Sequence, residues 1–299
     1  MSKFQIFTDS CCDLSKELRA ENQIEYFRMN IVVAGKEKHA DLDFEEYSPE
    51  QLYDWISDTK NHCKTNMVPG AEFEEKMRPF LEKGYDILYI GCSSKLTGSM
   101  NVFNLIRGEL QDDFPDRRMV GFDSLNASLG LGMMTLKARE LQKEGKSLDE
   151  VVAWLNENKN KFNQAATVET LTYLKEAGRV SGGSAFFGNI VGVKPIFISD
   201  AVGHNLVVEK VKGSKNALNR IFELTKEKIH KDECDTVFLG QGMAQEKAAQ
   251  LKERLINELG VKVVESWIGP IIGVSCGPGV LVTYCFGETV TKVGEDAKN

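Results

Sequence analysis

The first half of the chain alternates short apolar segments with longer segments of helical periodicity, and this alternation constrains the fold more than any other feature. Short apolar strands that alternate with helices of ten or more residues predict βαβ units and a parallel sheet. Because the strand segments are apolar throughout, we expect that sheet to be buried on both faces. The expected strands cover residues 4–8, 24–35 (one or two strands), 86–91 and 119–123. Helices are expected to begin near residues 14 and 99, and three more are expected at 49–58, 71–83 and 126–145.

The second half has a different pattern, in which strands outnumber helices and show alternating or mixed faces. After a helix at 148–161, helices are expected at 214–230 and 244–259. This pattern predicts an α+β domain with a mixed or antiparallel sheet. Six strand candidates cover residues 164–170, 194–200, 205–213, 235–242, 261–267 and 279–287.

The predicted fold class is therefore α/β with two domains. A Rossmann-like α/β domain with a parallel sheet is expected at 1–162, and the α+β domain at 163–290. The remaining residues, 291–299, form a polar tail that is expected to fray. A chain of 299 residues is long enough for two such domains.

Charge and hydropathy exclude several classes of protein. The net charge of −7 argues against a nucleic-acid-binding protein, which needs a basic face. No apolar stretch approaches the roughly 20 residues of a membrane-spanning helix. The start of the chain, MSKFQIFTDS, lacks the basic beginning and long apolar run of a secretory signal, so we expect a cytoplasmic protein.

The cysteines and histidines give no sign of a disulfide framework or a metal site. Seven cysteines form no C-x-x-C pair, and the four histidines are scattered without ligand spacing. We expect reduced thiols, no metal and no cofactor.

Three polar turns follow three of the expected strands: TDSCCD (8–13), CSSKLTGS (92–99) and DSLNAS (123–128). Ser, Thr and Asp are common helix N-caps, so each turn alone could be a cap. However, ligands of open parallel sheets bind at the carboxyl ends of strands. The coincidence of three such turns favours one shared pocket.

The turn CSSKLTGS has two enzymatic readings, and neither is well supported. A nucleophile elbow would need a second glycine where Lys95 stands, together with a histidine partner. The phosphate-binding motif G-x-x-x-x-G-K-[ST] is absent. The turn could still bind a small anion through its hydroxyls and free N–H groups, and Thr65, ahead of a helix expected near Gly70, supplies another hydroxyl.

Two glycine-containing segments complete the candidate site. Gly277-Pro278-Gly279 predicts a tight turn, either a plain connector or a wall close to a ligand. Arg179 follows Gly178, which is expected to end a helix. The Arg179 side chain is either exposed or faces the mouth of a pocket. A helix rich in glycine and phenylalanine is expected after it.

Taken together, these segments resemble the DegV family of bacterial fatty-acid-binding proteins. The resemblance spans nearly the whole chain in the family's order. It is carried by FTDSCCDL, KTNMVPGAEF, CSSKLTGSMN, DSLNASLGLG, LKEAGRVSG with VKPI and KVKGSKNAL, and IGPIIGVSCGPGV.

The resemblance implies a long-chain fatty acid buried in a tunnel between the two domains. The family's carboxylate-binding serine falls at Ser94 or Ser93, and its threonine falls at Thr65. Many members have T-H-x-G-P-G where this chain has Val274-Ser275-Cys276-Gly277-Pro278-Gly279, so Ser275 would replace that histidine. Arg179 and Gly277 would lie near the head group or the entrance.

The resemblance also implies a lipid carrier and not an enzyme. In some relatives the bound carboxylate is presented to a separate fatty acid kinase, which makes the acyl phosphate used as a phospholipid precursor. The alternative is an enzyme that acts directly on an acyl or phosphoryl substrate. It predicts turnover by the isolated protein.

Overall fold

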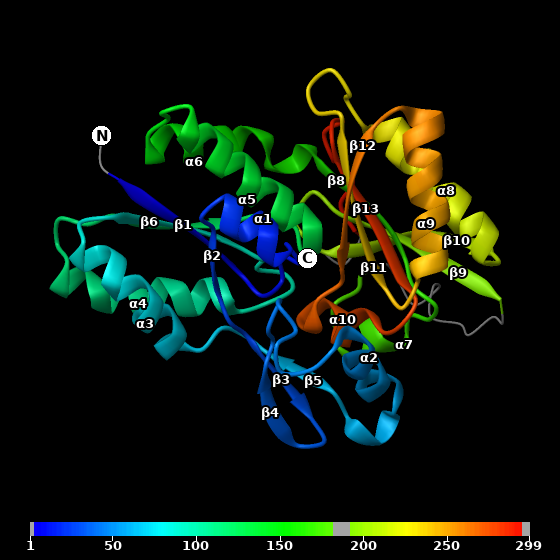
Figure 1. The fold of residues 1–299 in the computed structure, drawn as a ribbon, viewed down its shortest axis with the longest axis horizontal. Coiled ribbons are helices and arrows are strands. Elements are labelled where there is room, and N and C mark those ends of the chain that lie inside the picture. The colour runs from blue at the N-terminus through cyan, green and yellow to red at the C-terminus, as the bar shows by residue number, and fades with distance from the viewer. Residues whose placement is uncertain (1–2, 182–191, 295–299) are drawn as a thin grey trace.

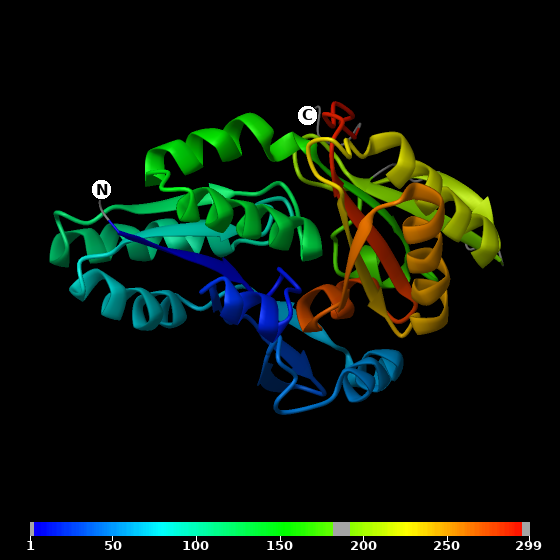
Figure 2. The ribbon, with the colours of Figure 1, turned by 45° about the horizontal axis from the view of Figure 1, so that its top comes forward.

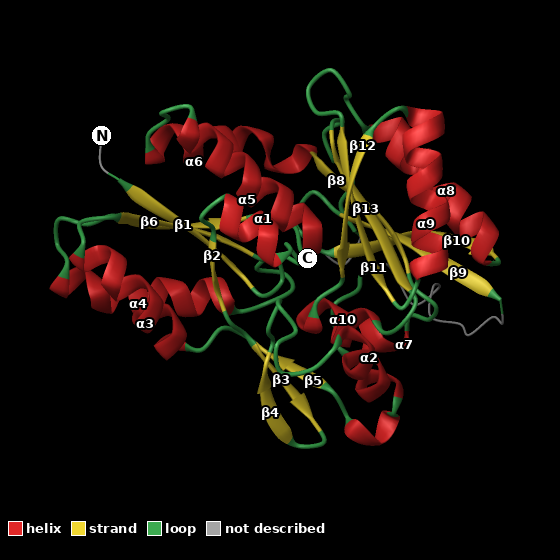
Figure 3. Cartoon of the chain, viewed as in Figure 1, coloured by secondary structure: helices red, strands yellow, loops and turns green. Residues whose placement is uncertain are grey.

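The computed structural model describes residues 3–181 and 192–294, which form two layered halves that lie side by side (Figures 1 and 2). Each half is built around its own main sheet, and a small third sheet lies below the junction (Figure 3). No helix within the described ranges has the length and apolar character needed to cross a bilayer.

The sheet of the first half is parallel throughout, in the order β2-β1-β6-β7. Helix α5 packs on one face and α3 and α4 lie against the other, so strands such as β6 are completely buried. This confirms the expectation of a parallel sheet covered on both sides. The strands are β1 (Phe4–Asp9), β2 (Glu25–Phe27), β6 (Asp86–Gly91) and β7 (Met119–Asp123).

The helices of this half begin where the sequence offers caps. Ser15, Ser48 and Ser147 each accept a backbone N–H from the first turn of the following helix. The helices are α1 (Lys16–Glu21), α2 (Pro49–Ser57), α3 (Gly70–Glu82), α4 (Ser99–Asp113), α5 (Ser128–Lys143) and α6 (Leu148–Asn158), with 3-10 turns at Thr59–Asn61 and Lys159–Lys161.

The apolar segment 24–35 forms two strands that belong to different sheets. β2 ends at Phe27, and the buried Ser10 hydroxyl then accepts the N–H of Met29 and donates to the carbonyl of Ala40. The chain next enters the small antiparallel sheet, ordered β4-β3-β5, in which Thr65 pairs with Ile31. Its strands are β3 (Asn30–Val33), β4 (Lys36–His39) and β5 (Lys64–Asn66).

The second half contains all six expected strands in one mixed sheet, ordered β10-β9-β8-β13-β11-β12. Only β11 and β12 run parallel; the other neighbouring strands of this sheet are antiparallel. Helices α8 and α9 cover its outer face (Figure 1). The elements are β8 (Phe162–Thr167), β9 (Val193–Ser199), β10 (Asn205–Lys212), α8 (Ser214–Lys228), β11 (Thr236–Gly242), α9 (Gln245–Arg254) with a π-helical turn at Leu255–Leu259, β12 (Lys262–Trp267) and β13 (Val280–Phe286).

Two short helices border the junction between the halves. Helix α7 (Thr172–Glu176) precedes Arg179, whereas the helix expected after Arg179 lies outside the described residues. Helix α10 (Pro270–Cys276) occupies the segment in which the sequence suggested only a connector or wall. Pro270 fits the first turn of the helix, and Gly277, with φ +75°, ends it. Proline and glycine therefore mark the two ends of a helix in this segment.

Hydrogen bonds tie the two halves together on both sides of the junction. The Tyr53 hydroxyl donates to the carbonyl of Ile268 at 3.1 Å, and the Ser93 hydroxyl donates to the carbonyl of Gly203 at 2.8 Å. The second main sheet begins at Phe162. The division into separate domains at residue 162 remains a prediction, since these bonds join the halves through buried groups.

Candidate functional site

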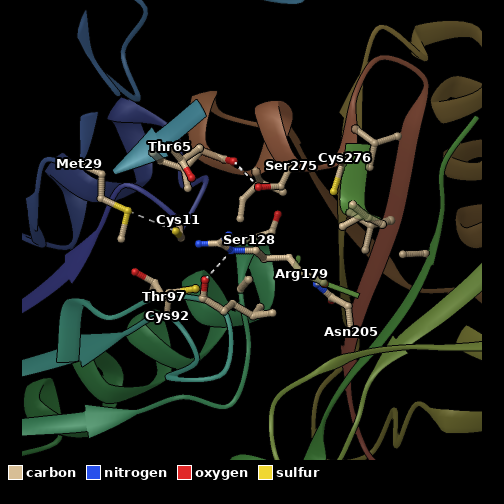
Figure 4. A pocket seen from close by; sticks show the side chains of 18 of the residues that line it. Cys11, Met29, Thr65, Cys92, Thr97, Ser128, Arg179, Asn205, Ser275 and Cys276 are labelled. Carbon is tan, nitrogen blue, oxygen red and sulfur yellow. Dashed lines mark hydrogen bonds between the residues drawn. The ribbon is translucent and has the colours of Figure 1, made fainter. Parts of the chain in front are cut away.

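A cavity of about 290 Å³ lies between the carboxyl edge of the parallel sheet and the inner face of the second main sheet (Figure 4). All three polar turns of the sequence contribute to its wall, through Cys11, through Cys92 and Leu96 to Gly98, and through Ala127 and Ser128. The structure thus brings the three turns to one pocket. Its volume is close to the lower limit of ordinary small-molecule sites.

Most of the cavity wall is apolar. Alternate residues of β8 and β13 face it, so Ala166, Val280 and Val282 line the cavity while Ala165 and Leu281 pack under α8. Phe197 of β9 and Ile271 of α10 extend the apolar wall. Such a surface suits a hydrocarbon ligand.

Asp9, at the end of β1, fixes two of the three turns. One carboxylate oxygen accepts the N–H of Cys11 at 2.9 Å, and the other accepts the N–H of Cys92 at 2.9 Å and the Tyr89 hydroxyl at 2.7 Å. Burial raises the pKa of Asp9, and these hydrogen bonds oppose the rise. The sequence marked the turn that begins here but not this role of Asp9.

Three of the expected site residues meet at one end of the cavity, although they come from distant segments. Thr65 of β5, Ser275 of α10 and Arg179 all line it, and Figure 4 shows Thr65 and Ser275 near each other. The same three residues also line an adjoining recess of about 470 Å³. This polar end of the cavity therefore borders a second, outer space.

Arg179 is the only charged side chain among the described residues that line the cavity. Its Nε donates to the carbonyl of Leu96 at 3.0 Å, and its guanidinium also donates to the carbonyl of Ala177. The side chain reaches toward the turn that carries Thr97 (Figure 4). Since both bonds go to neutral carbonyls, the positive charge has no carboxylate partner within the described part of the chain.

Ser93 and Ser94 do not line the cavity in this structure. Ser93 is buried, and its hydroxyl donates a hydrogen bond to the carbonyl of Gly203. Ser94 is exposed, and its N–H lies 3.3 Å from the Asp123 carboxylate. The hydroxyl that this turn does present to the cavity belongs to Thr97, which also contacts the Ser99 hydroxyl at 3.0 Å.

Gly277 also lies outside the cavity wall, at the turn after α10. A Cβ atom at this position would overlap the ring of Tyr173 on α7, and the residue has φ +75°. The turn therefore needs glycine for both its backbone conformation and its close packing.

Among the polar residues that line the cavity, Gln164 and Asn205 were not singled out from the sequence, whereas Ser128 belongs to the turn DSLNAS that the sequence marked. Asn205 was hidden because a single asparagine at an element end is an ordinary cap. Gln164 could have been found from the sequence, because alternate residues of a strand face the same side of the sheet. Its neighbours on that side, Phe162 and Ala166, are apolar, so a glutamine between them stands out.

Three thiols line the cavity, those of Cys11, Cys92 and Cys276. Burial raises the pKa of Cys276 to about 12, so this thiol stays protonated near neutral pH and is a poor nucleophile. Within residues 3–181 and 192–294 no group of three or more His, Cys, Asp or Glu side chains is arranged to hold a metal ion.

Comparison with known proteins gives one consistent result. A family model described as an uncharacterised protein of the DegV family matches residues 3–286. A DegV domain-containing protein of Clostridium perfringens is 31% identical over 290 residues, which cover 97% of this chain and 99% of that protein.

Solved structures agree with the sequence comparison. A DegV family protein from Thermus thermophilus, described by its fatty acid binding, superposes with a TM-score of 0.85 at 25% identity, covering 96% of this chain and 100% of the other. DegV from Bacillus subtilis, described as a fatty acid binding protein, gives a TM-score of 0.81 at 25% identity with the same coverage.

Proposed function

Because the chain belongs to the DegV family, we propose that it binds a long-chain fatty acid in the cavity between its two main sheets and carries it without converting it. The fatty acid binding described for the proteins from T. thermophilus and B. subtilis supports this proposal. The apolar wall of the cavity supports it from the chain itself.

The observation that carries the proposal is the charge of Arg179 at one end of the cavity, the single charge among the described residues that line it. The Arg179 guanidinium lies there with only carbonyl partners, and Thr65 and Ser275 supply hydroxyls beside it. A carboxylate would neutralise the charge and accept charge-assisted hydrogen bonds. We therefore assign the head group to Thr65, Arg179 and Ser275.

Ser93 and Ser94 have a supporting role in this proposal. The Ser93 bond to Gly203 holds the turn that places Leu96 and Thr97 in the wall. Ser94 lies on the exposed side of the same turn, where it would meet a partner before it met the ligand.

The acyl chain would supply most of the affinity. Each buried methylene contributes about 0.8 kcal/mol, so a chain of about 15 carbons gains on the order of 12 kcal/mol before ordering costs. A charge-assisted hydrogen bond adds only about 1.5 to 3 kcal/mol. The cavity would thus determine affinity, and the polar end would determine orientation.

The outer recess supports presentation of the carboxylate to a partner enzyme. Thr65, Arg179 and Ser275 border both spaces, so a carboxylate among them would face the recess. We propose that a separate fatty acid kinase reaches it from there. No histidine lines the described cavity wall, and its buried Cys276 is protonated, which favours carriage over catalysis by this chain.

A titration of lipid-stripped protein with octadecanoic acid tests the proposal. Replacement of Arg179 by Gln should weaken binding roughly tenfold to a hundredfold, because a charged hydrogen-bond partner of the carboxylate is lost. Arg118→Gln is the matched control, since Arg118 pairs with Asp149 on the surface, outside the cavity lining. Equal affinity in all three proteins would reject the assigned head-group site.

Turnover of an acyl or phosphoryl substrate by the isolated protein would favour the enzymatic alternative.

A further inference from the structure

A second polar group lies in the cavity wall, apart from the head-group residues. Gln164 of β8 and Tyr284 of β13 are direct partners in the antiparallel register, and both line the cavity. Ser128, at the first position of α5, lines it as well. We refer to Ser128, Gln164 and Tyr284 as the inner polar group.

Close packing brings the three side chains together. A Cβ atom at Gly130, in the first turn of α5, would lie 2.6 Å from the ring of Tyr284, so the ring rests directly on that turn. The Ser128 hydroxyl lowers the pKa of the adjacent Tyr284 phenol, against a larger rise caused by burial. Ser128 also donates a hydrogen bond of 2.6 Å to Asp13.

The inner polar group has unused hydrogen-bonding capacity. Gln164 is 9% exposed, and its amide oxygen accepts the Ser199 hydroxyl at 2.7 Å. The other atom of the amide has no partner among the described residues. Ser128 donates its proton to Asp13, so toward a ligand its oxygen can act as an acceptor. A buried amide usually finds a partner, so this one calls for a ligand or a water.

The inner polar group is unsuited to a carboxylate. The buried Asp13 carboxyl lies directly behind Ser128, and Asp9 lies close enough to act on it electrostatically. A carboxylate there would lie beside two buried acidic groups, whereas Arg179 offers a positive charge elsewhere in the same cavity. The group therefore suits a neutral hydrogen-bonding substituent.

The strand geometry indicates where along a bound chain this substituent would lie. Ser275 is followed by the Gly277 turn and then by Val280, the first residue of β13, and Tyr284 lies four residues further along that strand. Four residues of strand span about 14 Å. Since an extended covalent chain advances roughly 1.2 Å per bond, a ligand that follows β13 passes about eleven bonds between Val280 and Tyr284. The inner polar group would therefore meet the middle part of a long acyl chain.

We propose that this cavity selects a fatty acid that carries a hydroxyl group near the middle of its chain, held by Ser128, Gln164 and Tyr284. The inference rests on the proposed fatty-acid binding and names the substrate class of that site. The hydroxyl would accept from the Gln164 amide and donate to Ser128. An unsubstituted chain would leave the amide unpaired against hydrocarbon, which costs affinity.

Competitive loading tests the inference. Lipid-stripped protein is offered octadecanoic acid and octadecanoic acid with a hydroxyl at the tenth carbon, and the bound fraction of each is measured by mass spectrometry. We expect the hydroxylated acid to be preferred about tenfold. Equal loading, or a preference for the plain acid, would overturn the inference and leave the proposed function intact. Loading of neither acid would overturn both.

Two variants identify the residues responsible. Gln164→Leu and Tyr284→Phe should each reduce the preference severalfold while octadecanoic acid still binds. Tyr47→Phe is the matched control, because the Tyr47 hydroxyl donates to the carbonyl of His39 and lines none of the cavity. Should the Tyr284 variant fail to fold, Gln164→Leu decides alone. A preference that survives in Gln164→Leu would contradict the assignment.

Discussion

Asp13 shows how a single residue connects the site to the fold. Its side chain is 2% exposed and accepts hydrogen bonds from Ser128 at 2.6 Å and from the N–H of Gly269 at 3.0 Å, while its carbonyl accepts the Ser266 hydroxyl at 2.8 Å. It thus joins the turn after β1 to α5 and to the start of α10. Burial raises the pKa of Asp13 to about 7, and the hydrogen bonds only partly offset the rise.

The raised pKa of Asp13 predicts a pH-dependent stability. Between about pH 4 and 7 the unfolded chain has lost the Asp13 proton while the folded protein keeps it, so the folded state binds more protons. The free energy of unfolding should therefore fall as the pH rises through this window, by up to about 1.4 kcal/mol per pH unit from this group. In Asp13→Asn that contribution should disappear.

Denaturant unfolding of the two proteins across this range measures the difference. The gap between wild type and Asp13→Asn isolates Asp13 from other titrating groups such as Asp9, whose pKa is also raised. Parallel pH profiles for the two proteins would contradict the buried, protonated state of Asp13.

The adjacent residues Ser93 and Ser94 should differ in how much they contribute to stability. Ser93 makes a buried hydrogen bond to Gly203 in the other half of the molecule, whereas the Ser94 side chain is exposed. Ser93→Ala should lower the free energy of unfolding by about 1 to 3 kcal/mol, because the Gly203 carbonyl loses its buried donor. Ser94→Ala should change it by less than about 0.5 kcal/mol. Thermal unfolding of both variants checks this, and equal effects would reject the role assigned to Ser93.

Helix α5 depends on close packing beside the site. A Cβ atom at Gly132 would lie 2.7 Å from the Leu14 side chain and 2.8 Å from the carbonyl oxygen of Cys12. The helix therefore approaches the first turn of the chain through glycine. Gly108, in the middle of α4, has nothing within 4 Å of such an atom.

These two glycines predict opposite effects of the same substitution. Gly108→Ala should stabilise the protein by about 0.5 to 1 kcal/mol, since alanine favours the helix. Gly132→Ala should destabilise it by about 1 to 3 kcal/mol, because the overlap with a backbone carbonyl outweighs the gain in propensity. Denaturant midpoints measure both changes, and stabilisation by Gly132→Ala would show that α5 can move away from Cys12.

The elements differ in how far the sequence alone determines them. Largely apolar strands such as β6 and capped helices such as α6 follow directly from local pattern and were predicted. Helix α10 was missed because its seven residues are bounded by glycine and proline, which also mark turns. The pairing of Thr65 with Ile31 in the small sheet depends on long-range contacts that no local pattern contains.

The candidate site was predictable to a similar extent. The three polar turns meet because the carboxyl ends of neighbouring parallel strands share one edge, and the sequence revealed those turns. It could not show that Ser93 turns away toward Gly203 or that Thr97 faces the cavity, since adjacent hydroxyls are distinguished only by backbone direction.

At the scale of the whole molecule, neither half contains the cavity alone. The parallel sheet contributes the polar turns, the second sheet contributes the apolar wall, and Thr65 arrives from the small sheet between them. Arg179 reaches across to the carbonyl of Leu96, so the head-group end includes a contact between the halves. Ligand that binds only the assembled cavity should stabilise the two halves together.

That linkage gives a prediction for unfolding. Loading with a fatty acid at a hundred times its dissociation constant should raise the free energy of unfolding by about 2.7 kcal/mol, because the unfolded chain offers no cavity. Calorimetry of stripped and loaded protein measures the shift. A melting temperature that does not respond to loading would mean that the acid binds elsewhere or binds both states equally.

Identification of the lipid that the purified protein carries is the decisive test of fatty-acid binding by this chain. Native mass spectrometry of the purified protein, followed by solvent extraction, should show a single fatty acid per chain that is lost on stripping and recovered on reloading. A protein that carries no fatty acid after purification, and that takes up none when stripped and offered one, would contradict the account.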